Sequence, residues 1–288
     1  MASRTLAAPS ARRVPRRRSP ANQLLLHAVL LVFAVAALAP FVWMVFGSFK
    51  PFRELTTSLD LLPREWTLMN YQAILNRVNF LSAFRNNVVY AGSTTLAVLL
   101  TSSLAGYVFA KYRFWGKDLL FAAIISTMMI PFSVVLIPLY VFMAEIGAIN
   151  TLWGLVLPSV WSAFGIFLLR QFMETIPSEL LDAARIDGAS EPRIFAQIVL
   201  PLTGAPLVAL AIVHFLATWD NLLWPSVVLS SPDTQTLPIV LAGLRSLYWN
   251  RYDIWMAGSM LTVVPVMAIY AFASGQFIRG VAMTGMKG

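Results

Sequence analysis

Hydrophobic residues along the chain gather into six long runs, and shorter polar stretches separate them. Each run approaches or exceeds the ~20 apolar residues that a helix needs to cross a bilayer. The runs cover residues 24–46, 88–110, 119–143, 152–169, 206–229 and 254–277. None shows the polar stripe that a helix in a soluble bundle would carry on its outer face. The pattern therefore predicts an all-α integral membrane protein with six transmembrane helices.

Polar and helix-breaking residues inside the runs are few, and they mark candidate functional positions. Asp220 is the one formally charged residue within the six runs, and an acid at membrane depth usually faces a cavity or a partner. Its neighbours Trp219 and Asn221, together with Pro131 in the third run, complete a set of candidate pore or interface residues. A hydrogen bond inside the bundle is the alternative role for Asp220. Prolines within the runs are compatible with spanning helices, because neighbouring helices can satisfy the freed carbonyls.

Composition strengthens the membrane assignment and removes several chemistries. Hydrophobic residues make up 58% of the 288 residues and charged residues 12%, against ~45–50% and ~25% in an ordinary soluble domain. The chain has no cysteine, which excludes a disulfide framework, a thiolate metal site and a cysteine nucleophile. We expect no metal site, because His214 has no second ligand near it at metal spacing. No catalytic residues are predicted.

Basic residues predict the orientation of the spans. With the N-terminus inside, 14 of the 21 Lys and Arg residues lie on the inner side, as the positive-inside rule requires. Both termini are therefore expected in the cytoplasm. Residues 1–23 form a basic cytoplasmic tail that anchors the topology, and we expect no nucleic-acid partner despite the net charge of +8. The first run is longer than the ~7–15 apolar residues of a signal peptide, which argues against cleavage.

A compact polar loop, residues 173–205, lies between the fourth and fifth runs, on the predicted cytoplasmic side. Its pattern predicts two short helices that meet at a corner. Pro177 suits the first turn of the first helix, and Gly188 is expected at positive φ, where it ends that helix. Ser190 is expected to cap the second helix, and Pro201 to stop it.

Two apolar faces in this loop leave its role open. Leu180, Ala183, Ala184 and Asp187 share one face of the first helix at helical spacing. An apolar stripe on the second helix is formed by Ile194, Phe195, Ile198 and Val199. Small residues beside exposed apolar positions indicate a docking surface. A connector that only packs under its own bundle would show the same pattern, and the residues alone do not separate the two.

The spacing within the loop resembles the cytoplasmic loop of permeases from ATP-binding-cassette importers. That signature is Glu-Ala-Ala, three residues, Gly, nine residues, Ile, one residue, Leu-Pro. Here it is met by Asp182, Ala183, Ala184, Gly188, Ile198, Leu200 and Pro201. Asp182 in place of glutamate is the one departure. The segments "FGSFKP", "SLAGYVFAKYRFWGK" and "TLPIVLAGL" also resemble the carbohydrate branch of the family. The ending "QFIRGVAMTGMKG" is similar to the second, G-type permease of maltose-like importers, with one residue fewer before the final lysine.

The resemblance implies a permease domain over residues 24–288 that forms half of a sugar-translocation pathway in the bacterial inner membrane. Its partners would be a second, different permease, two ATP-binding subunits and an extracytoplasmic sugar-binding protein. The chain itself would hold no cofactor, and it carries no phosphate-binding loop sequence for ATP. The residues expected to couple the loop to the ATPase are Glu179, Asp182, Ala183, Ala184, Asp187, Gly188, Ile198, Leu200 and Pro201.

Two other function classes compete with an ATP-driven importer. A secondary transporter or channel would be expected to show internal repeats with paired interrupted helices, or more intramembrane charge. A membrane enzyme acting on a lipid-linked sugar would need acids clustered at one membrane face. The acidic cluster between Glu174 and Glu191 is already accounted for by the loop signature. Co-purification of an ATPase would separate the first class from the others.

Overall fold

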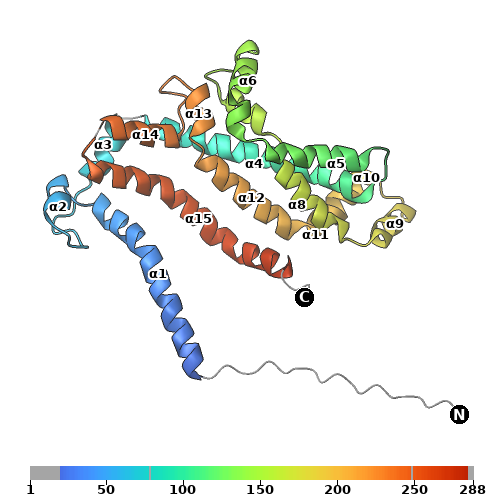
Figure 1. The fold of residues 1–288 in the computed structure, drawn as a ribbon, viewed down its shortest axis with the longest axis horizontal. Helices are drawn as coiled ribbons and strands as arrows, with labels where there is room; N and C mark the ends of the chain where they lie inside the picture. The colour runs from blue at the N-terminus through green and yellow to red at the C-terminus, as the bar shows by residue number, and fades with distance from the viewer. Residues whose placement is uncertain (1–19, 78, 248, 285–288) are drawn as a thin grey trace.

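A computed structural model describes residues 20–77, 79–247 and 249–284, and these residues form helices and connecting segments without strands (Figure 1). The helices of the first half are α1 (Pro20–Ser48), α2 (Phe52–Thr57), α3 (Met69–Arg77), α4 (Phe80–Lys111), α5 (Lys117–Ser126), η1 (Thr127–Met129) and α6 (Phe132–Glu145). Those of the second half are α7 (Leu152–Val156), η2 (Leu157–Ser159), α8 (Ala163–Glu174), α9 (Ser178–Ile186), α10 (Glu191–Ile194), η3 (Phe195–Val199), α11 (Leu200–Leu202), α12 (Gly204–Trp219), α13 (Leu223–Val228), α14 (Leu237–Leu247) and α15 (Tyr252–Thr284). The all-α class is confirmed.

Three helices in the described part of the chain are long and apolar enough to cross a membrane alone. They are Asn22–Ser48, Phe80–Lys111 and Tyr252–Ala271. Three bent pairs pass the same test together: α5–η1 with α6 (bend of 100°), α7–η2 with α8 (42°), and α10–α11 with α12 (77°). If each bent pair counts as one span, the total reaches six, in agreement with the six predicted runs. The first helix begins at Pro20, before the predicted start at residue 24, and residues 1–19 of the predicted tail lie outside the described residues.

The third predicted span, residues 119–143, is formed by two helices that meet at a sharp bend. The first of them stops at Met129, and α6 starts at Phe132 at an angle of 100°. Ile130, directly before Pro131, has an extended backbone (φ −87°, ψ 115°). A proline pushes the preceding residue out of the helical region because its ring clashes with that residue's backbone. The chain therefore turns at Pro131, whereas Pro138 is tolerated inside α6.

The fifth predicted span, residues 206–229, is also divided. Helix α12 ends at Trp219, and α13 begins only at Leu223. Asp220 lies at φ −90°, ψ 2°, outside the regular helix, so the acid follows the helix end instead of interrupting a continuous span. At its other end α12 bends away from α11 at Thr203, whose hydroxyl donates to the carbonyl of Val199 at 2.9 Å. The apolar part of this span is therefore α12, and the helices before it belong to the 173–205 loop.

Helix α4 lies at the centre of the bundle, where α8 and α12 pack along it (Figure 1). The crossing with α8 is close because glycines line it. A Cβ on Gly165 would lie 2.5 Å from Oγ of Ser102, and one on Gly106 would lie 3.1 Å from the backbone nitrogen of Arg170. Small residues allow helix backbones to approach each other in membranes. The sequence of α4 thus places it against α8 with little room to slide apart.

Helix α1 stands apart from the bundle over most of its length (Figure 1), and the rest of the chain buries none of its most apolar stretch. Its C-terminal end is fastened to α3. Oγ of Ser48 lies 2.7 Å from the hydroxyl of Tyr71, and Nδ2 of Asn70 donates to the carbonyls of Ser48 (2.9 Å) and Lys50 (2.8 Å). An apolar helix surface of this size requires cover from lipid or from another protein.

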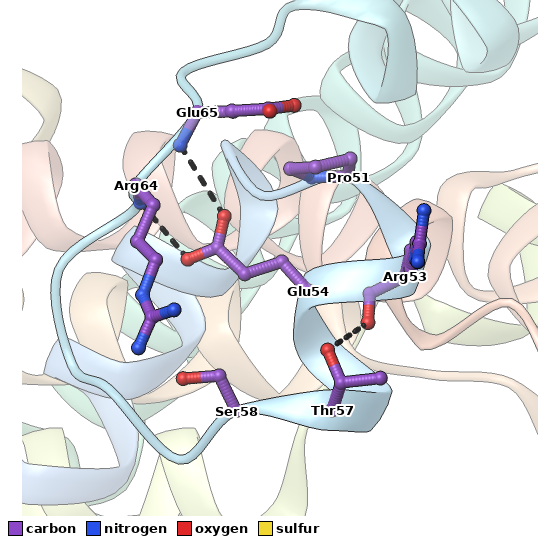
Figure 2. A pocket seen from close by; sticks show the side chains of 7 residues that line it. All are labelled: Pro51, Arg53, Glu54, Thr57, Ser58, Arg64 and Glu65. Atoms are coloured by element: carbon purple, nitrogen blue, oxygen red, sulfur yellow. Dashed lines mark hydrogen bonds between the residues drawn. The ribbon is translucent and has the colours of Figure 1, made fainter.

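The segment after α1 folds around a polar cavity of about 320 Å³ at the opposite end of the molecule from α9 (Figures 1 and 2). Figure 2 shows the carboxylate of Glu54 pointing toward the backbone at Arg64 and Glu65, where the chain folds back on itself. It accepts hydrogen bonds from the N–H groups of Arg64 (2.9 Å) and Glu65 (3.3 Å). These hydrogen bonds lower the pKa of the Glu54 carboxyl, and the bond from the Arg64 N–H has the largest effect. The cavity therefore belongs to a loop that closes on itself.

Candidate functional site

The 173–205 loop contains the two predicted helices, and α9 projects from one end of the bundle (Figure 1). Helix α9 begins one residue later than predicted. Pro177 is the N-cap residue, with an extended ψ of 132°, and is not part of the first helical turn. Glu179 is in the first turn, where the helix dipole favours negative charge. The local signals in the sequence thus place the first helix to within one residue.

Gly188 has φ of +82°, so its predicted left-handed conformation is confirmed. The turn that it makes closes the end of α9: the N–H of Gly188 donates to the carbonyl of Arg185 (3.0 Å), and that of Ala189 donates to the carbonyl of Ala184 (2.9 Å). Nothing lies within 4 Å of a Cβ built on Gly188. The requirement for glycine is therefore conformational and not a matter of space.

Two predictions about the second helix are wrong in detail. Ser190 occupies the N-cap position, but its side chain makes no capping hydrogen bond. Pro192 fills one of the two positions whose N–H the cap would have bonded, which removes that donor. Pro201 does not stop the helix, which continues to Leu202 through a π-helical turn at Phe195–Val199. That wider turn accommodates the proline, which would clash with the carbonyl of Gln197 in a regular α-helix.

The two helices of the loop differ in which side they leave open. On α9, Leu181 is buried and Ala184 packs beside it, whereas Asp182 and Ala183 are exposed and the apolar side chain of Ile186 is 87% exposed. Glu179, Leu180 and Asp187 are exposed as well. The open face of α9 therefore combines acids, a small residue and an uncovered apolar side chain, which is the composition expected of a docking surface.

The apolar stripe on the second helix is covered by the chain itself. Ile194 and Val199 are buried in a cluster that also contains Leu169 and Leu210, and Phe195 and Ile198 are half-buried against it. This half of the loop packs under its own bundle, as the connector interpretation expects. Of the remaining predicted residues, Leu200 is half-buried and Pro201 is exposed.

Glu191, which the sequence did not single out, is the main electrostatic junction of the loop. Its carboxylate accepts hydrogen bonds from Nε of Arg185 (2.7 Å) and from the hydroxyls of Tyr112 (2.5 Å) and Tyr107 (3.0 Å). These hydrogen bonds lower the pKa of the Glu191 carboxyl to about 2, and the bond from Arg185 has the largest effect. Arg185 also pairs with Asp182 at 2.6 Å. An acid next to a proline in a first helical turn gives no hint of tyrosine partners some 80 positions away.

The candidate pore residues divide into buried and exposed members. Trp219 is buried, with its ring against Phe84 and Phe215, and its Nε1–H donates to the carbonyl of Thr262 at 3.3 Å. Trp219 therefore packs inside the bundle of this chain, and its pore or interface role stays a prediction. Asn221 is half-buried, and its side chain donates to the hydroxyl of Tyr90 at 3.4 Å.

Asp220 and Pro131 are exposed on the surface of the single chain. The Asp220 side chain accepts no hydrogen bond within the described residues, so the alternative of a structural bond inside the bundle receives no support from that part of the chain. The two helix breaks adjoin each other, because Phe132 meets Trp224 of α13 edge-on at 6.1 Å. They therefore form one irregular region away from the projecting α9 (Figure 1).

Comparisons with known proteins agree with this architecture. A sequence profile of the family described as binding-protein-dependent transport system inner membrane component matches residues 102–278. The arabinooligosaccharides transport system permease protein AraQ of Halalkalibacterium halodurans is 38% identical over 95% of this chain and 99% of its own length. The lactose transport system permease protein LacG of Rhizobium radiobacter is 34% identical over 92% of this chain and 96% of its own.

A similar fold is found among solved structures. A chain from a bacterial ABC transporter involved in the import of the acidic polysaccharide alginate superimposes with a TM-score of 0.79. The alignment covers 91% of this chain and 99% of the other, at 22% sequence identity. At this identity the likeness concerns the fold alone.

Proposed function

Since the chain belongs to the family of binding-protein-dependent transport system inner membrane components, we propose that it is the permease subunit of an ATP-driven carbohydrate importer and that its 173–205 loop couples it to an ATPase. A carbohydrate cargo is supported by the relatives named for arabinooligosaccharides and lactose, which match nearly the full chain. The coupling role is supported by the loop itself.

The observation that carries the coupling proposal is the open face of α9. Its exposed acids, Glu179, Asp182 and Asp187, flank the exposed Ala183 and Ile186. Ala183 permits a close approach, Ile186 supplies apolar area, and the acids favour a basic partner surface. We infer that this face docks on an ATP-binding subunit, which holds the ATP, so that this chain needs no cofactor of its own.

The remaining partners follow from the family and from the uncovered surfaces. A second permease would complete the translocation pathway and cover the apolar surface of α1, which the chain leaves open. A second ATP-binding subunit would serve that permease, and an extracytoplasmic binding protein would deliver the sugar. The complex would lie in the bacterial inner membrane with both termini of this chain in the cytoplasm.

Affinity purification of the tagged chain from native membranes tests this assignment. We expect an ATPase carrying a phosphate-binding loop and a second permease to co-purify with the wild-type chain. The Ala183→Trp variant should keep the permease and lose the ATPase, because a bulky ring on the open face of α9 prevents close approach. Ala196→Trp is the matched control, since Ala196 is an exposed alanine on the other helix of the same loop.

A wild-type chain that purifies without any ATPase would contradict the proposal and favour a secondary transporter. Loss of the ATPase from both tryptophan variants would instead move the docking surface away from α9. These outcomes do not depend on the identity of the sugar, so the assay can be performed before the cargo is known.

A further inference from the structure

We propose that the C-terminal end of α4 holds the 173–205 loop on both sides of its corner, so that the loop and α4 move as one body during transport. This proposal rests on the coupling role assigned to the loop above. The residues of this α4 clamp are Tyr107, Lys111 and Tyr112.

The first contact of the α4 clamp holds the start of the loop. Nζ of Lys111 donates to the carbonyl of Ile176 at 2.5 Å and lies 3.4 Å from the carbonyl of Glu174, the last residue of α8. The last carbonyls of a helix have no partner within it and favour a positive charge nearby. Lys111 therefore ties the end of α8 to α4 at the point where the chain leaves for α9.

The second contact holds the loop after its corner. The hydroxyls of Tyr107 and Tyr112 both donate to Glu191, the first residue of α10. Arg185 on α9 donates to the same carboxylate. A charged acceptor makes each of these hydrogen bonds stronger than a neutral one. One side chain thus joins α4, α9 and α10, and the corner at Gly188 is closed against α4.

Apolar packing fills the space between the two polar contacts. The ring of Tyr107 lies 5.4 Å from that of Phe195 and 5.5 Å from that of Tyr112. Tyr107, Leu181 and Ile194 are buried in one cluster, which places residues from α4, α9 and α10 in a common core. Close-packed cores transmit displacement because they have little free volume. The loop is therefore attached to α4 across a surface and not at a single point.

Of the three helices that could carry motion away from the loop, α4 is the one without a sharp bend. Along the chain, the loop is joined to α8, which has a 42° break before it, and to α12, which follows a 77° bend. Helix α4 has no such break over its 32 residues, a length of roughly 48 Å at 1.5 Å per residue. Motion passed along the chain can be absorbed at the bends, whereas motion passed to α4 reaches its far end.

The far end of α4 contacts the irregular region around Asp220. Nδ2 of Asn87 donates to the carbonyl of Trp219 at 3.2 Å, next to the break between α12 and α13. Nδ2 of Asn86 donates to the carbonyls of Asp233 (2.8 Å) and Gln235 (3.1 Å) beyond α13. Helix α4 thus connects the coupling loop with the two adjoining helix breaks, which the covalent path reaches only through bends.

Distance measurements between paired spin labels test the proposal directly. The chain has no cysteine, so Ala196→Cys on the loop and Leu100→Cys on α4, both exposed, can be labelled without background. The complex is purified with its ATPase and measured without nucleotide and after trapping with ATP and vanadate. We expect the same distance distribution in both states, since the loop and α4 move together. A shift of the wild-type distance on trapping would overturn the proposal.

Variants of the α4 clamp supply the second readout. In the double variant Glu191→Gln, Tyr112→Phe, we expect the distance to shift on trapping while the ATPase still co-purifies, because the docking face of α9 is unaltered. The matched control is Arg193→Ala, which removes a 3.0 Å hydrogen bond to Gln197 within the second helix of the loop and leaves the α4 contacts intact. It should behave as wild type. An unchanged distance in the double variant would show that these contacts do not hold the loop.

The two proposals fail in different ways. If no ATPase co-purifies with the wild-type chain, the coupling function itself is wrong. If the ATPase co-purifies but the wild-type loop moves relative to α4, only the α4 clamp is wrong. Should the double variant fail to fold, the wild-type distance measurement alone still decides the proposal.

Discussion

Gly188 shows how one backbone conformation sets the shape of a whole loop. Its φ of +82° turns the chain between α9 and α10, and no neighbouring atom limits the size of a side chain there. A substitution therefore acts through the backbone alone. The sequence could predict this conformation because a glycine directly after an amphipathic helical segment most often ends the helix in the left-handed region.

A pair of variants at this position gives a residue-scale prediction. Gly188→Val should displace the second helix of the loop, because a left-handed conformation costs a non-glycine residue roughly 1–2 kcal/mol and a β-branched one more. Gly188→Asn should be milder, since asparagine tolerates that region. We expect both variants to reach the membrane, and ATPase co-purification to fall in the order Gly, Asn, Val. Equal behaviour of Asn and Val would show that the corner conformation does not matter.

Asp220 is a residue whose environment the sequence could not predict, although the sequence drew attention to it. An acid in an apolar run attracts attention, yet the structure places it after the end of α12 and exposes it. The sequence left two roles for Asp220: a contact outside the chain or a hydrogen bond within it. The second role receives no support, because no described residue hydrogen-bonds to the Asp220 side chain. The role of Asp220 in a pathway or at an interface with another subunit therefore stays a prediction.

Among the elements, the crossing of α4 and α8 depends on the absence of side chains. Gly165 faces Ser102, and Gly106 faces the backbone of Arg170. The close approach lets Lys111 reach the end of α8, so the packing of these two helices and the position of the loop are connected. Hydrophobic runs in the sequence do not report such a contact, because glycine and serine are common in spanning helices for several reasons.

Gly165→Ala tests this contact at the element scale. The new Cβ would lie 2.5 Å from Oγ of Ser102 and 3.1 Å from Cβ of Ser102, so the serine side chain or the two helices must shift. We expect a loss of about 1–3 kcal/mol in stability, as for other overpacked sites. Thermal unfolding in detergent measures it. Gly92→Ala is the control on α4, since nothing lies within 4 Å of its Cβ, and it should be neutral or stabilising by about 0.5–1 kcal/mol.

The Gly165→Ala effect should also be relieved by a second change. Ser102→Ala removes the oxygen that the new methyl group would meet, so the double variant should recover part of the lost stability. Non-additivity of this kind is expected only for residues in contact. If Gly165→Ala unfolds at the wild-type temperature, α4 and α8 do not pack as closely as the structure indicates.

For the whole molecule, the arrangement predicts which parts lie on each side of the membrane. The segment after α1 and the projecting α9 lie at opposite ends of the bundle (Figure 1). Single cysteines at Met69 and Gln235 should react with an impermeant thiol reagent added to intact cells, whereas cysteines at Ser190 or in the N-terminal tail should not. Met69 and Ser190 are both exposed, so a difference between them reports sidedness. Labelling of Ser190→Cys from outside would reverse the topology and exclude the coupling role.

The sequence by itself determined the features that depend on nearby residues. The length of an apolar run decides whether a segment can cross a bilayer, and the conformational limits of glycine decide where α9 ends. Both are local properties, so the six runs, the all-α class and the two-helix loop could be predicted. The break in the third run is local as well, because Pro131 pushes the backbone of Ile130 out of the helical region.

Only the tertiary structure decided which surfaces of these elements meet. Glu191 accepts hydrogen bonds from tyrosines that lie 79 and 84 positions earlier in the chain, and the ring of Trp219 packs against Phe84 and Phe215 inside the bundle. The apolar stripe on the second loop helix is covered, whereas the face of α9 stays open. Such pairings depend on how the helices cross, and crossings depend on side-chain packing across the whole bundle. No local pattern encodes them, because each surface acquires its role only when a distant segment packs against it or leaves it free.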